Sequence, residues 1–499
     1  MTTRMQPAVA IIGAGLAGIA VAANLARAGF VNFTVYEKAA GPGGVWWHNT
    51  YPGCEVDVNS QAYSYSFFPY IWQSTHASQK ELQEYVGEVI NRYELAARIR
   101  YNTCVSEGRW NGRDRAHYLL TTRGREGPFD IVVSCVGMLS TPKVPAWARN
   151  GSFQGPVFHT AEFDHSVSLE GKIVAVVGTG STACQVAPAI APLVKQLDIY
   201  QREPGYVLPK KSRPFTPAEL RRFQRYPVTQ RIDRWRLLWR AGRDTKAFNP
   251  ASRQQQRIRD FHRSYLERSV NDPVVREALL PAYPYGCKRP VFTSAFYRAL
   301  NRSNVRLIPK EVQSLSQDSV IDVEGQARRA DIVIVATGFQ ATNYLAGIDV
   351  YGEDGREIHE FWAGEPWAFL GMGVPGFPNF LILYGPNTNG GWSICAQLER
   401  QSEAVVRYVR RVSRGLGPLD TRPNVARTYD RWIRRANHER RGSAEQGCHN
   451  YYQASSGKNV TQWPYSHLAY ALAARILPRV GFTVAKRKRQ PEQAAAAEH

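Results

Sequence analysis

Two glycine-rich segments have the spacing with which proteins bind the phosphates of a dinucleotide. The first is a GxGxxG pattern after the apolar run 8–12, and its glycines are Gly13, Gly15 and Gly18. The second is a GxGxxA pattern after the apolar run 173–177, and it comprises Gly178, Thr179, Gly180, Ser181, Thr182 and Ala183. Such glycines let the backbone approach a pyrophosphate at a helix N-terminus, where free N–H groups and the helix dipole favour an anion. One pattern alone fits an ordinary turn, but two together indicate nucleotide binding.

A charged residue follows each pattern at the same distance. Glu37 lies 24 residues after Gly13, and Arg202 lies 24 residues after Gly178. A carboxylate at the end of the second strand accepts hydrogen bonds from both ribose hydroxyls and repels a 2′-phosphate, so Glu37 favours FAD or NAD. The guanidinium of Arg202 pairs with a 2′-phosphate, although a solvated surface arginine fits the same spacing. We therefore expect FAD in the first site and NADPH in the second.

The segments around these patterns predict the elements that position them. Residues 130–137 (DIVVSCVG) resemble residues 331–338 (DIVIVATG), and each segment is typical of a buried strand that ends in a glycine turn. The uncharged run 7–26 is long enough to cross a membrane, but its glycines divide it into a strand and a helix. We therefore predict an α/β fold with two Rossmann-like dinucleotide-binding domains and an inserted helical subdomain, without an integral membrane segment.

The predicted order of the domains is discontinuous. The FAD-binding domain takes 1–145 and 343–485, the NADPH-binding domain takes 146–209 and 285–342, and the helical insertion takes 210–284. Residues 486–499 contain little that could pack, so we expect them to form a disordered tail.

An apolar stripe recurs at helical spacing in the insertion, after Pro227. It consists of Ile232, Trp235, Leu238 and Trp239. Such a stripe usually packs against the rest of a protein, so we expect it to lie on a neighbouring domain and the insertion to shape the substrate cavity.

The composition excludes several classes of function. The chain has 499 residues, 43% hydrophobic content and seven cysteines that lie at least 31 residues apart. No CxxC pair is present, which argues against a zinc site and against a disulfide reductase, and we expect no bound metal. The odd number of cysteines argues against a secreted disulfide framework, so we expect a cytoplasmic protein.

The net charge of +21 is concentrated in the predicted insertion. Between Lys210 and Arg268 there are 17 basic and five acidic residues, a net charge of +12. No zinc-finger, RNP or helix-turn-helix pattern accompanies this charge, so we expect no nucleic-acid partner. A solvated helical face that helps to attract NADPH explains it better, while weak attachment to anionic membranes stays open.

Longer motifs resemble those of class B flavoprotein monooxygenases, the group that contains flavin-containing monooxygenases and type I Baeyer–Villiger monooxygenases. The resemblance covers nearly the whole chain. Its motifs are the flavin segment GPGGVWWHNTYPGCEVDVNSQAYSYSF (41–67), the signature FQGPVFHTAEFD (153–164), KRP (288–290), PGFPNF (375–380), GPNT (385–388), and the GKN and WP elements near Gly457 and Trp463.

The resemblance implies an NADPH-dependent flavin monooxygenase. Such an enzyme inserts one oxygen atom of O2 into a small organic substrate, here a ketone, and forms an ester or lactone through a flavin peroxide. An N- or S-oxygenating flavin-containing monooxygenase is the alternative, and a non-catalytic flavin redox sensor is a more distant one. We expect a monomer or a homodimer. Beyond the two glycine patterns, the residues expected to bind FAD or NADPH are Glu37, Lys38, Gly44, Val45, Trp46, Asp57, Val58, Tyr63, Val105, Gly137, Arg202, Lys288 and Asn387.

Arg289 and Asp57 are the predicted catalytic residues. A fixed cation stabilises the peroxide anion and the oxyanion that develops when the ketone is attacked. Arg289 suits this role because its guanidinium keeps its proton, and the resemblance points to the same residue. Asp57 is expected to pair with Arg289 and orient it, although a simple turn residue also fits that position. Lys288 is expected to help Arg202 with the NADP phosphate.

Phe163 departs from the Baeyer–Villiger signature. It stands where those enzymes usually have Trp, whereas Asp164 is kept. Phe or Tyr at this position is typical of flavin-containing monooxygenases, but the presence of both Asp57 and the KRP element favours the Baeyer–Villiger reaction. We expect His159 of the same motif to be a core histidine at an interdomain turn, not the catalytic base.

Tyr451 and Tyr452 lie where relatives carry aromatic residues on a mobile loop over NADP. The glycine and serines of the segment ASSGKN (454–459) favour such a loop. We therefore treat this region as a lid, as a hypothesis.

Overall fold

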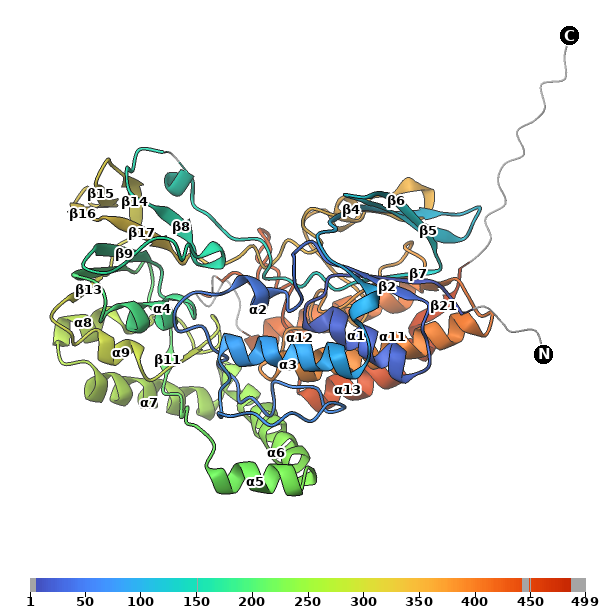
Figure 1. Ribbon diagram of the computed structural model, residues 1–499, viewed down its shortest axis with the longest axis horizontal. Coiled ribbons are helices and arrows are strands. Elements are labelled where there is room, and N and C mark those ends of the chain that lie inside the picture. Colours follow the sequence, from blue (N-terminus) through green and yellow to red (C-terminus); the bar gives the residue numbers. More distant parts are fainter. Residues whose placement is uncertain (1–5, 150, 442–447, 449, 486–499) are drawn as a thin grey trace, which may run out of the picture.

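The protein consists of two lobes, each built around a parallel sheet. The computed structural model describes residues 6–149, 151–441, 448 and 450–485. Figure 1 shows the lobes side by side, with helices α5 (Pro217–Arg225) and α6 (Val228–Asp244) projecting below them. The predicted α/β class with two sheets of the dinucleotide-binding type is confirmed. The predicted tail, 486–499, lies outside the described residues.

The first lobe contains a five-stranded parallel sheet in the order β19-β7-β1-β2-β3. All four residues of β1 are apolar and buried, as in parallel strands that helices cover on both faces. The apolar N-terminal run therefore forms a strand and a helix, and no helix among the described residues is long and apolar enough to cross a membrane. The elements are β1 (Val9–Ile12), α1 (Leu16–Arg27), β2 (Phe33–Tyr36), α2 (Val45–His48), α3 (Gln79–Arg92), β3 (Ile99–Arg100), β7 (Ile131–Ser134) and β19 (Phe380–Ile382).

The second lobe repeats this plan in the order β13-β10-β9-β17-β8, again with all strands parallel. The similar segments 130–137 and 331–338 form β7 and β17, which pair with β1 and β9 respectively. The two lobes therefore place their glycine turns at equivalent positions, at the carboxyl ends of their central strands. The elements are β8 (Val157–His159), β9 (Ile173–Val177), α4 (Ala183–Ile190), β10 (Gln196–Tyr200), α9 (Phe296–Ala299), β13 (Val305–Ile308) and β17 (Ile332–Val335).

Smaller sheets extend both lobes. In the first lobe β4, β5 and β6 form an antiparallel sheet to which β18 adds in parallel, and in the second lobe β14, β15 and β16 form an antiparallel sheet. The elements are β4 (Val105–Asn111), β5 (Ala116–Thr121), β6 (Gly124–Phe129), β11 (Val207–Leu208), β12 (Val291–Phe292), β14 (Val312–Leu315), β15 (Ser319–Asp322), β16 (Ala327–Arg329), β18 (Asp349–Tyr351), β20 (Leu419–Thr421) and β21 (Phe482–Val484).

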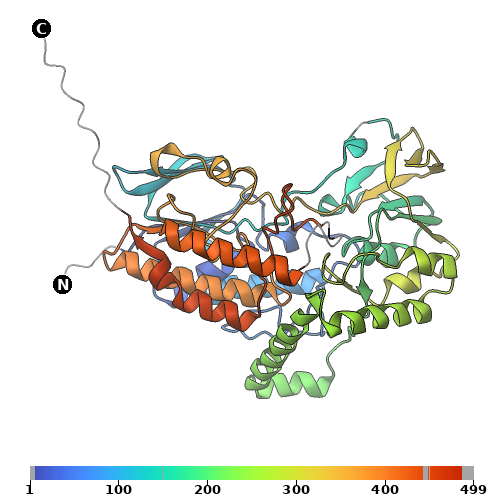
Figure 2. The same cartoon turned by 180° about the vertical axis from the view of Figure 1, so that it is seen from behind.

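The C-terminal part of the chain returns to the first lobe. Strand β19 pairs with β7, helix α11 packs on α1, and Asn24 Nδ2 donates to Ser402 Oγ at 2.7 Å. Figure 2 shows these C-terminal helices lying along the back of the lobe. The boundaries at residues 145 and 342 stay a prediction. The elements are α10 (Ile358–Trp362), α11 (Ile394–Ser413), α12 (Pro423–Arg441), α13 (His467–Ile476) and α14 (Pro478–Gly481).

The segment between β11 and β12 is helical, and its helices are α5, α6, α7 (Arg253–Ser269) and α8 (Pro273–Ala278). Helix α5 ends before Pro227 and helix α6 begins after it. Proline interrupts a helix because it has no N–H to donate and its ring clashes with the preceding turn.

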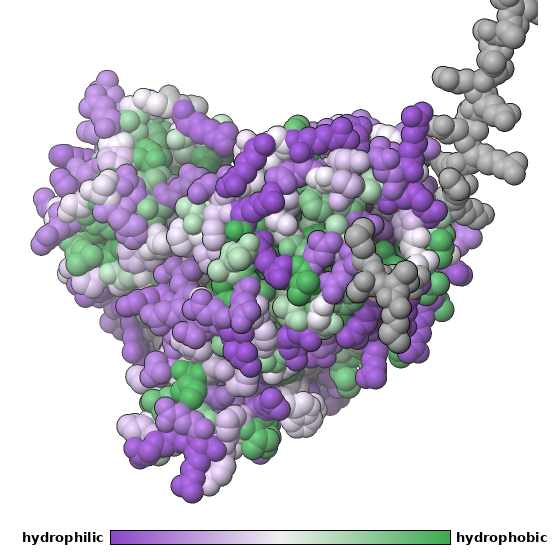
Figure 3. Space-filling model, turned by 45° about the vertical axis from the view of Figure 1, so that its right-hand side comes forward, coloured by the Kyte–Doolittle hydropathy of each residue, from purple (hydrophilic) through white to green (hydrophobic). Residues whose placement is uncertain are grey.

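The expectation that the apolar stripe of α6 packs against a domain is wrong. Trp235 is 65% exposed, Trp239 is 52% exposed, and their rings stack on each other. The face of α6 that meets the protein body is polar: Gln230 Nε2 donates to the Tyr70 carbonyl at 3.1 Å, and Arg234 Nη2 lies 3.0 Å from the Glu399 carboxylate. Figure 3 shows apolar patches among hydrophilic side chains on the projecting helices.

Candidate active site

The glycine pattern of the first lobe forms a close-packed cradle at the start of α1. Gly13 has φ +103°, and a Cβ there would lie 2.8 Å from the Cys135 carbonyl oxygen. A Cβ on Gly18 would collide with the Gly13 carbonyl, so the third glycine allows α1 to pack on its strand. Gly44 closes the cradle, because a Cβ there would lie 2.9 Å from the Gly15 Cα. No side chain caps the first turn of α1, which leaves this helix N-terminus to a ligand.

Glu37 is buried at the carboxyl end of β2, beside the cradle. Its Oε2 accepts a hydrogen bond from Ala14 N–H at 2.6 Å, and its Oε1 accepts one from Ala39 N–H at 2.8 Å. These bonds fix a buried negative charge next to the glycine turn. The neighbouring Lys38 is exposed. A group bound here must therefore donate hydrogen bonds, as ribose hydroxyls do, and cannot be a 2′-phosphate.

An aromatic pair follows the cradle. Trp46 Nε1 donates to the Tyr63 hydroxyl at 3.1 Å, and Gln79 Nε2 donates to the Trp46 carbonyl at 2.6 Å. Val45 begins the short helix α2, and Val58 packs partly buried on the core of the first lobe. The structure therefore brings these four predicted cofactor-binding residues, Val45, Trp46, Val58 and Tyr63, together on the segment that follows Gly44.

The second cradle repeats the geometry of the first. Gly178 N–H donates to the Tyr200 carbonyl at 2.9 Å, as Gly13 N–H donates to the Tyr36 carbonyl at 2.7 Å. A Cβ on Gly178 would lie 2.5 Å from the Ala336 carbonyl oxygen. Residues 179–182 form the turn that leads into α4, and no side chain caps this helix. The turn consists of Thr179, Gly180, Ser181 and Thr182.

Basic side chains stand at the carboxyl end of β10, where the second cradle opens. Arg202 is 68% exposed and lies 3.4 Å from Glu311. Lys288 forms an ion pair with Glu203, the neighbour of Arg202 in the chain, and its Nζ lies 4.8 Å from the centre of the Tyr283 ring. The loop that carries Lys288 therefore meets the strand end that carries Arg202, and both cations are accessible to a phosphate.

Arg289 and Asp57 meet between the lobes. Arg289 Nη2 donates to Asp57 Oδ2 at 2.7 Å and to Oδ1 at 3.0 Å, and Arg289 Nε donates to Oδ2 at 3.2 Å. The Asp57 carboxylate raises the pKa of Arg289 well above its usual range, and burial opposes this shift. The guanidinium side chain stays 34% exposed, so a permanent cation is held in a fixed orientation without being enclosed.

Three tyrosine hydroxyls lie close enough to interact electrostatically with Arg289, and only two of these residues were singled out from the sequence. Tyr451 Oη donates to Tyr452 Oη at 3.0 Å, and Tyr384 Oη donates to Asn389 Oδ1 at 3.0 Å. Burial raises the pKa of all three hydroxyls, and the cation of Arg289 opposes the shift at each of them. Tyr384 directly precedes the GPNT motif, which is the signal that could have identified it.

A disulfide bond joins Cys287 to Cys448. The sequence did not predict this bond, because the cysteines are 161 residues apart and belong to no CxxC pattern. Cys287 directly precedes Lys288 and Arg289, and Cys448 lies three residues before Tyr451. The bond therefore fastens the tyrosine segment to the turn that carries both cations.

The site contains a further cation that spacing could not reveal. Lys210 is buried, forms an ion pair with Glu55, and its Nζ donates to the Val56 carbonyl at 3.0 Å. Burial lowers the pKa of the neighbouring His76 to about 4, and Lys210 adds to this shift. Because Glu55 and Val56 precede Asp57, Lys210 holds the backbone from which Asp57 reaches Arg289.

A polar contact also joins the two lobes at this point. Tyr51 Oη donates to Gln185 Oε1 at 3.0 Å, and Gln185 Nε2 donates to the Glu55 carbonyl at 2.9 Å. Gln185 belongs to α4, so the second glycine pattern and the Asp57 segment are positioned by the same contact.

His159 and Phe163 are structural in their surroundings. His159 is buried at the end of β8, its Nδ1 accepts a hydrogen bond from Ala161 N–H at 3.1 Å, and burial lowers its pKa. The Phe163 ring packs edge-on against Phe158 at 5.1 Å. These contacts agree with the expected core histidine and give it no contact with Arg289.

Three predicted cofactor-binding residues lie at the borders of the site. Val105 is a buried residue at the start of β4, and Gly137 has φ +72° in the turn after β7. Asn387 uses its side-chain amide internally, since Nδ2 donates to the Asn459 carbonyl at 3.0 Å and to the Gln462 carbonyl at 3.2 Å. Asn387 therefore holds the C-terminal segment in place, and its amide donors are already engaged.

Comparisons with known proteins agree with this geometry. Residues 6–233 match the model of the flavin-binding monooxygenase-like family. The chain is 34% identical to a Baeyer–Villiger monooxygenase of Pseudomonas aeruginosa over 93% of this chain and 90% of the relative, and 34% identical to one of Streptomyces coelicolor over 91% and 88%.

Solved structures share the fold. An oxidised steroid monooxygenase bound to NADP superposes with a TM-score of 0.86 at 26% identity, over 97% of this chain and 100% of the other. The closed form of cyclohexanone monooxygenase gives a TM-score of 0.84 at 23% identity, over 97% and 100%, which supports the fold alone.

Proposed function

This chain belongs to the flavin-binding monooxygenase family that includes the Baeyer–Villiger monooxygenases, and we propose that it converts a ketone into an ester or lactone with FAD, NADPH and O2. The observation that carries this proposal is the ion pair between Arg289 and Asp57, which places a permanent cation between the two nucleotide cradles. A non-catalytic redox sensor would have no use for such a cation.

The residues of the first lobe fit FAD. The uncapped start of α1 and the glycine cradle suit a pyrophosphate, and the buried Glu37 carboxylate suits an unphosphorylated ribose. The segment 44–63 would hold the flavin, with the Trp46–Tyr63 pair beside it. These assignments to individual residues are proposals.

The residues of the second lobe fit NADPH. The turn 178–182 suits the pyrophosphate, and Arg202 and Lys288 supply two cations for a 2′-phosphate. Glu203 neutralises part of this charge in the structure, so the phosphate would compete with Glu203 for Lys288. Bound FAD and NADPH supply what side chains cannot: a hydride donor and a group that activates oxygen.

The chain itself contributes charge, orientation and exclusion of water. Arg289 stabilises the negative charge that develops on the ketone oxygen, and it does so without giving up a proton. Asp57 holds the guanidinium by three hydrogen bonds, and Lys210 holds the backbone before Asp57. Tyr451 and Tyr452 interact electrostatically with Arg289, and we propose that their segment acts as a lid.

Isotope labelling tests the proposed reaction. The purified protein with FAD is incubated with NADPH, ¹⁸O2 and a panel of cyclic ketones, aryl ketones and steroid ketones. We expect at least one ketone to give an ester or lactone that contains one ¹⁸O atom, with one NADPH consumed for each product formed. NADPH oxidation that yields only hydrogen peroxide with every substrate of the panel would contradict the proposal.

N- or S-oxygenation is the second candidate, and Phe163 is the observation that favours it. Its ring occupies the signature position at which flavin-containing monooxygenases carry Phe or Tyr. The same incubation with sulfides and tertiary amines distinguishes the two. Products from sulfides or amines combined with none from any ketone would assign the second function.

The remaining properties are proposals of the same kind. O2 is the co-substrate, the chain acts as a monomer or homodimer, and it works in the cytoplasm. Size-exclusion chromatography with light scattering measures the oligomeric state.

A further inference from the structure

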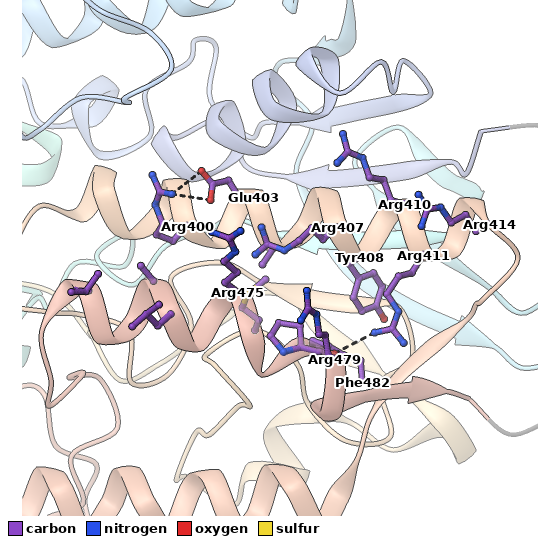
Figure 4. Close-up of a pocket in the computed structure, with 16 residues that line it drawn as sticks. Arg400, Glu403, Arg407, Tyr408, Arg410, Arg411, Arg414, Arg475, Arg479 and Phe482 are labelled. Carbon is purple, nitrogen blue, oxygen red and sulfur yellow. Dashed lines mark hydrogen bonds and ion pairs between the residues drawn. The ribbon is translucent and has the colours of Figure 1, made fainter. Parts of the chain in front are cut away.

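A cavity of about 720 Å³ lies between α11 and α13, away from the ion pair of Arg289 and Asp57. Figure 4 shows arginine side chains from both helices around this space. Its apolar floor includes Ala404, Tyr408 and Phe482. The charged residues that line it are Arg400, Glu403, Arg407, Arg410, Arg411, Arg414, Arg475 and Arg479.

Most of these arginines have no acidic partner. Arg400 pairs with Glu399 and Glu403. Within the described part of the chain, no Asp or Glu oxygen lies within 4.0 Å of the guanidinium nitrogens of the other six. Arg407 Nη2 donates to the Ala474 carbonyl at 3.0 Å and Arg411 Nη1 to the Pro478 carbonyl at 3.2 Å, so the fold itself holds these cations close together.

The mutual repulsion of these cations affects the pKa of one of them, Arg407. Burial lowers the pKa of Arg407, and Arg475, Arg400 and Arg410 lower it further, while Glu403 opposes the shift. An anion placed between α11 and α13 would relieve this repulsion, and guanidinium groups bind phosphate oxygens with two hydrogen bonds at once.

A row of exposed aliphatic side chains begins at the cavity, where Leu468 and Leu472 belong to its lining. Leu468, Leu472, Ile476 and Val480 recur every four residues along α13 and α14, and each leaves 51–68% of its surface exposed. Residues at this spacing lie on one side of a helix. Arg475 and Arg479 lie beside this row, so aliphatic and cationic side chains point out of the same surface.

We propose that this surface, the α11–α13 face, docks on an anionic phospholipid bilayer. The face consists of the aliphatic row and the six arginines without acidic partners. Helices that lie on a bilayer insert an aliphatic row among the acyl chains and place arginines at the level of the phosphates. The α11–α13 face has both the aliphatic row and the arginines, and no helix is required to cross the bilayer.

Other occupants fit fewer of these observations. A second copy of the chain would bring the same arginines against each other, and like charges repel. A free phosphate would explain the arginines but would leave the aliphatic row in water. Nucleic acid would place its phosphates against leucine, isoleucine and valine side chains, which offer it no hydrogen bonds.

Vesicle sedimentation tests the proposal without any measurement of turnover. The full chain with FAD is mixed with sucrose-loaded vesicles of phosphatidylcholine alone, or of phosphatidylcholine with about one third phosphatidylglycerol. We expect binding only to the anionic vesicles and a strong decrease in high salt. The double variant Arg475→Gln/Arg479→Gln should bind more weakly, by roughly fivefold for each arginine removed.

The matched control is Arg302→Gln/Arg329→Gln. This variant loses the same net charge from exposed positions of the second lobe and should bind like the parent protein. A second variant, Leu468→Ser/Leu472→Ser, removes the aliphatic contribution without any change of charge. It should also weaken binding, and thermal unfolding confirms that each variant is folded.

Three outcomes would overturn the proposal. In the first, the parent protein does not bind anionic vesicles, which would leave an acidic protein as the partner of this face. In the second, the arginine variant binds as strongly as the parent. In the third, only Trp235→Ser/Trp239→Ser loses binding, which would place the docking surface on α6.

Discussion

The two charged residues at the centre of the site depend on each other. Asp57 and Arg289 are 232 residues apart, and three hydrogen bonds join them. Removal of one partner of such a pair leaves the other charge partly buried and unpaired, which costs about 3–5 kcal/mol in a fully buried site and less here, where Arg289 is partly exposed.

Replacement of Arg289 should separate cofactor use from product formation. We expect Arg289→Ala to bind FAD and oxidise NADPH but to lose ester formation on the order of 100-fold or more, because the developing oxyanion loses its cation. Product yield per NADPH, measured by gas chromatography, checks this. Ketone conversion at the parent rate would show that the cation is another residue.

The Asp57→Asn variant is the companion experiment. It keeps the shape of the side chain and leaves Arg289 charged, so it should form product more slowly than the parent but faster than Arg289→Ala. An effect as large as that of Arg289→Ala would mean that the carboxylate does more than orient the guanidinium.

We propose that Arg202 decides which nicotinamide dinucleotide is preferred. Its guanidinium is exposed at the end of β10, and hydrogen bonds to charged groups are worth about 1.5–3 kcal/mol. We therefore expect Arg202→Ala to raise the KM for NADPH by roughly 10- to 100-fold and to leave the KM for NADH nearly unchanged. Steady-state kinetics with both dinucleotides check this.

Arg306→Ala is the control for Arg202→Ala. Arg306 is also a partly exposed arginine of the second lobe, but it pairs with Asp198 along β10 and β13. Its replacement should leave the ratio of the two KM values as in the parent protein. A change of this ratio in both variants would point to a general effect of charge on the lobe.

At the scale of elements, the Cys287–Cys448 bond links the C-terminal segment to the turn that carries Lys288 and Arg289. The tyrosine segment then folds back on itself, because Ala454 N–H donates to the Lys458 carbonyl and Gly457 N–H donates to the Ala454 carbonyl, both at 2.9 Å. Cross-links that close long loops stabilise proteins mainly by restricting the unfolded chain.

Loss of this bond should loosen the segment around Gly457. We expect Cys448→Ser, or the parent protein in dithiothreitol, to lose about 2–4 kcal/mol of unfolding free energy and to be cut faster by proteases near Gly457. Chemical denaturation and limited proteolysis with and without NADP check this.

Cys104→Ser, which removes an exposed free thiol, is the control. Equal rates of cutting near Gly457 in the parent, the reduced parent, Cys448→Ser and Cys104→Ser would contradict the proposal that the disulfide bond holds this segment. Equal rates with and without NADP would contradict the lid.

At the scale of the whole molecule, buried histidines contribute to the response to acid. Burial lowers the pKa of His117, His262 and His467 to about 4, as it does for His76. The unfolded chain binds protons at these residues near pH 6.5, while the folded protein does not until about pH 4. The stability that these histidines contribute is therefore full above pH 6.5 and is lost as the pH decreases from 6.5 towards 4.

His117→Gln should reduce this acid sensitivity. His117 belongs to β5 and is buried, and its Nε2 lies 2.7 Å from the carbonyl of Pro378, just before β19, to which a glutamine amide can also donate. We expect the loss of stability between pH 6.5 and pH 4 to shrink by about 3 kcal/mol, measured by urea denaturation. His438→Gln, at an exposed position of α12, should behave like the parent. If the parent, His117→Gln and His438→Gln all lose the same unfolding free energy between pH 6.5 and pH 4, His117 is not responsible for the acid sensitivity.

The sequence by itself determined the two nucleotide cradles and the charge beside each. Gly13, Gly178, Glu37 and Arg202 act within single strand–turn–helix units of about 30 residues, so the local pattern contains the whole geometry. The sequence also predicted buried strands at 130–137 and 331–338, but their pairing with β1 and β9 became known only from the fold, because each pair joins segments more than 100 residues apart.

Only the tertiary structure decided what lies between the lobes and on the surface. The contacts of Lys210 with Glu55 and of Cys287 with Cys448 join segments more than 150 residues apart, and no spacing rule connects them. The stripe of α6 shows the same limit, because helical periodicity reveals an apolar side but not which neighbour covers it. Here the side of α6 that faces the protein carries Arg234, which pairs with Glu399, and the tryptophans lie on the exposed side.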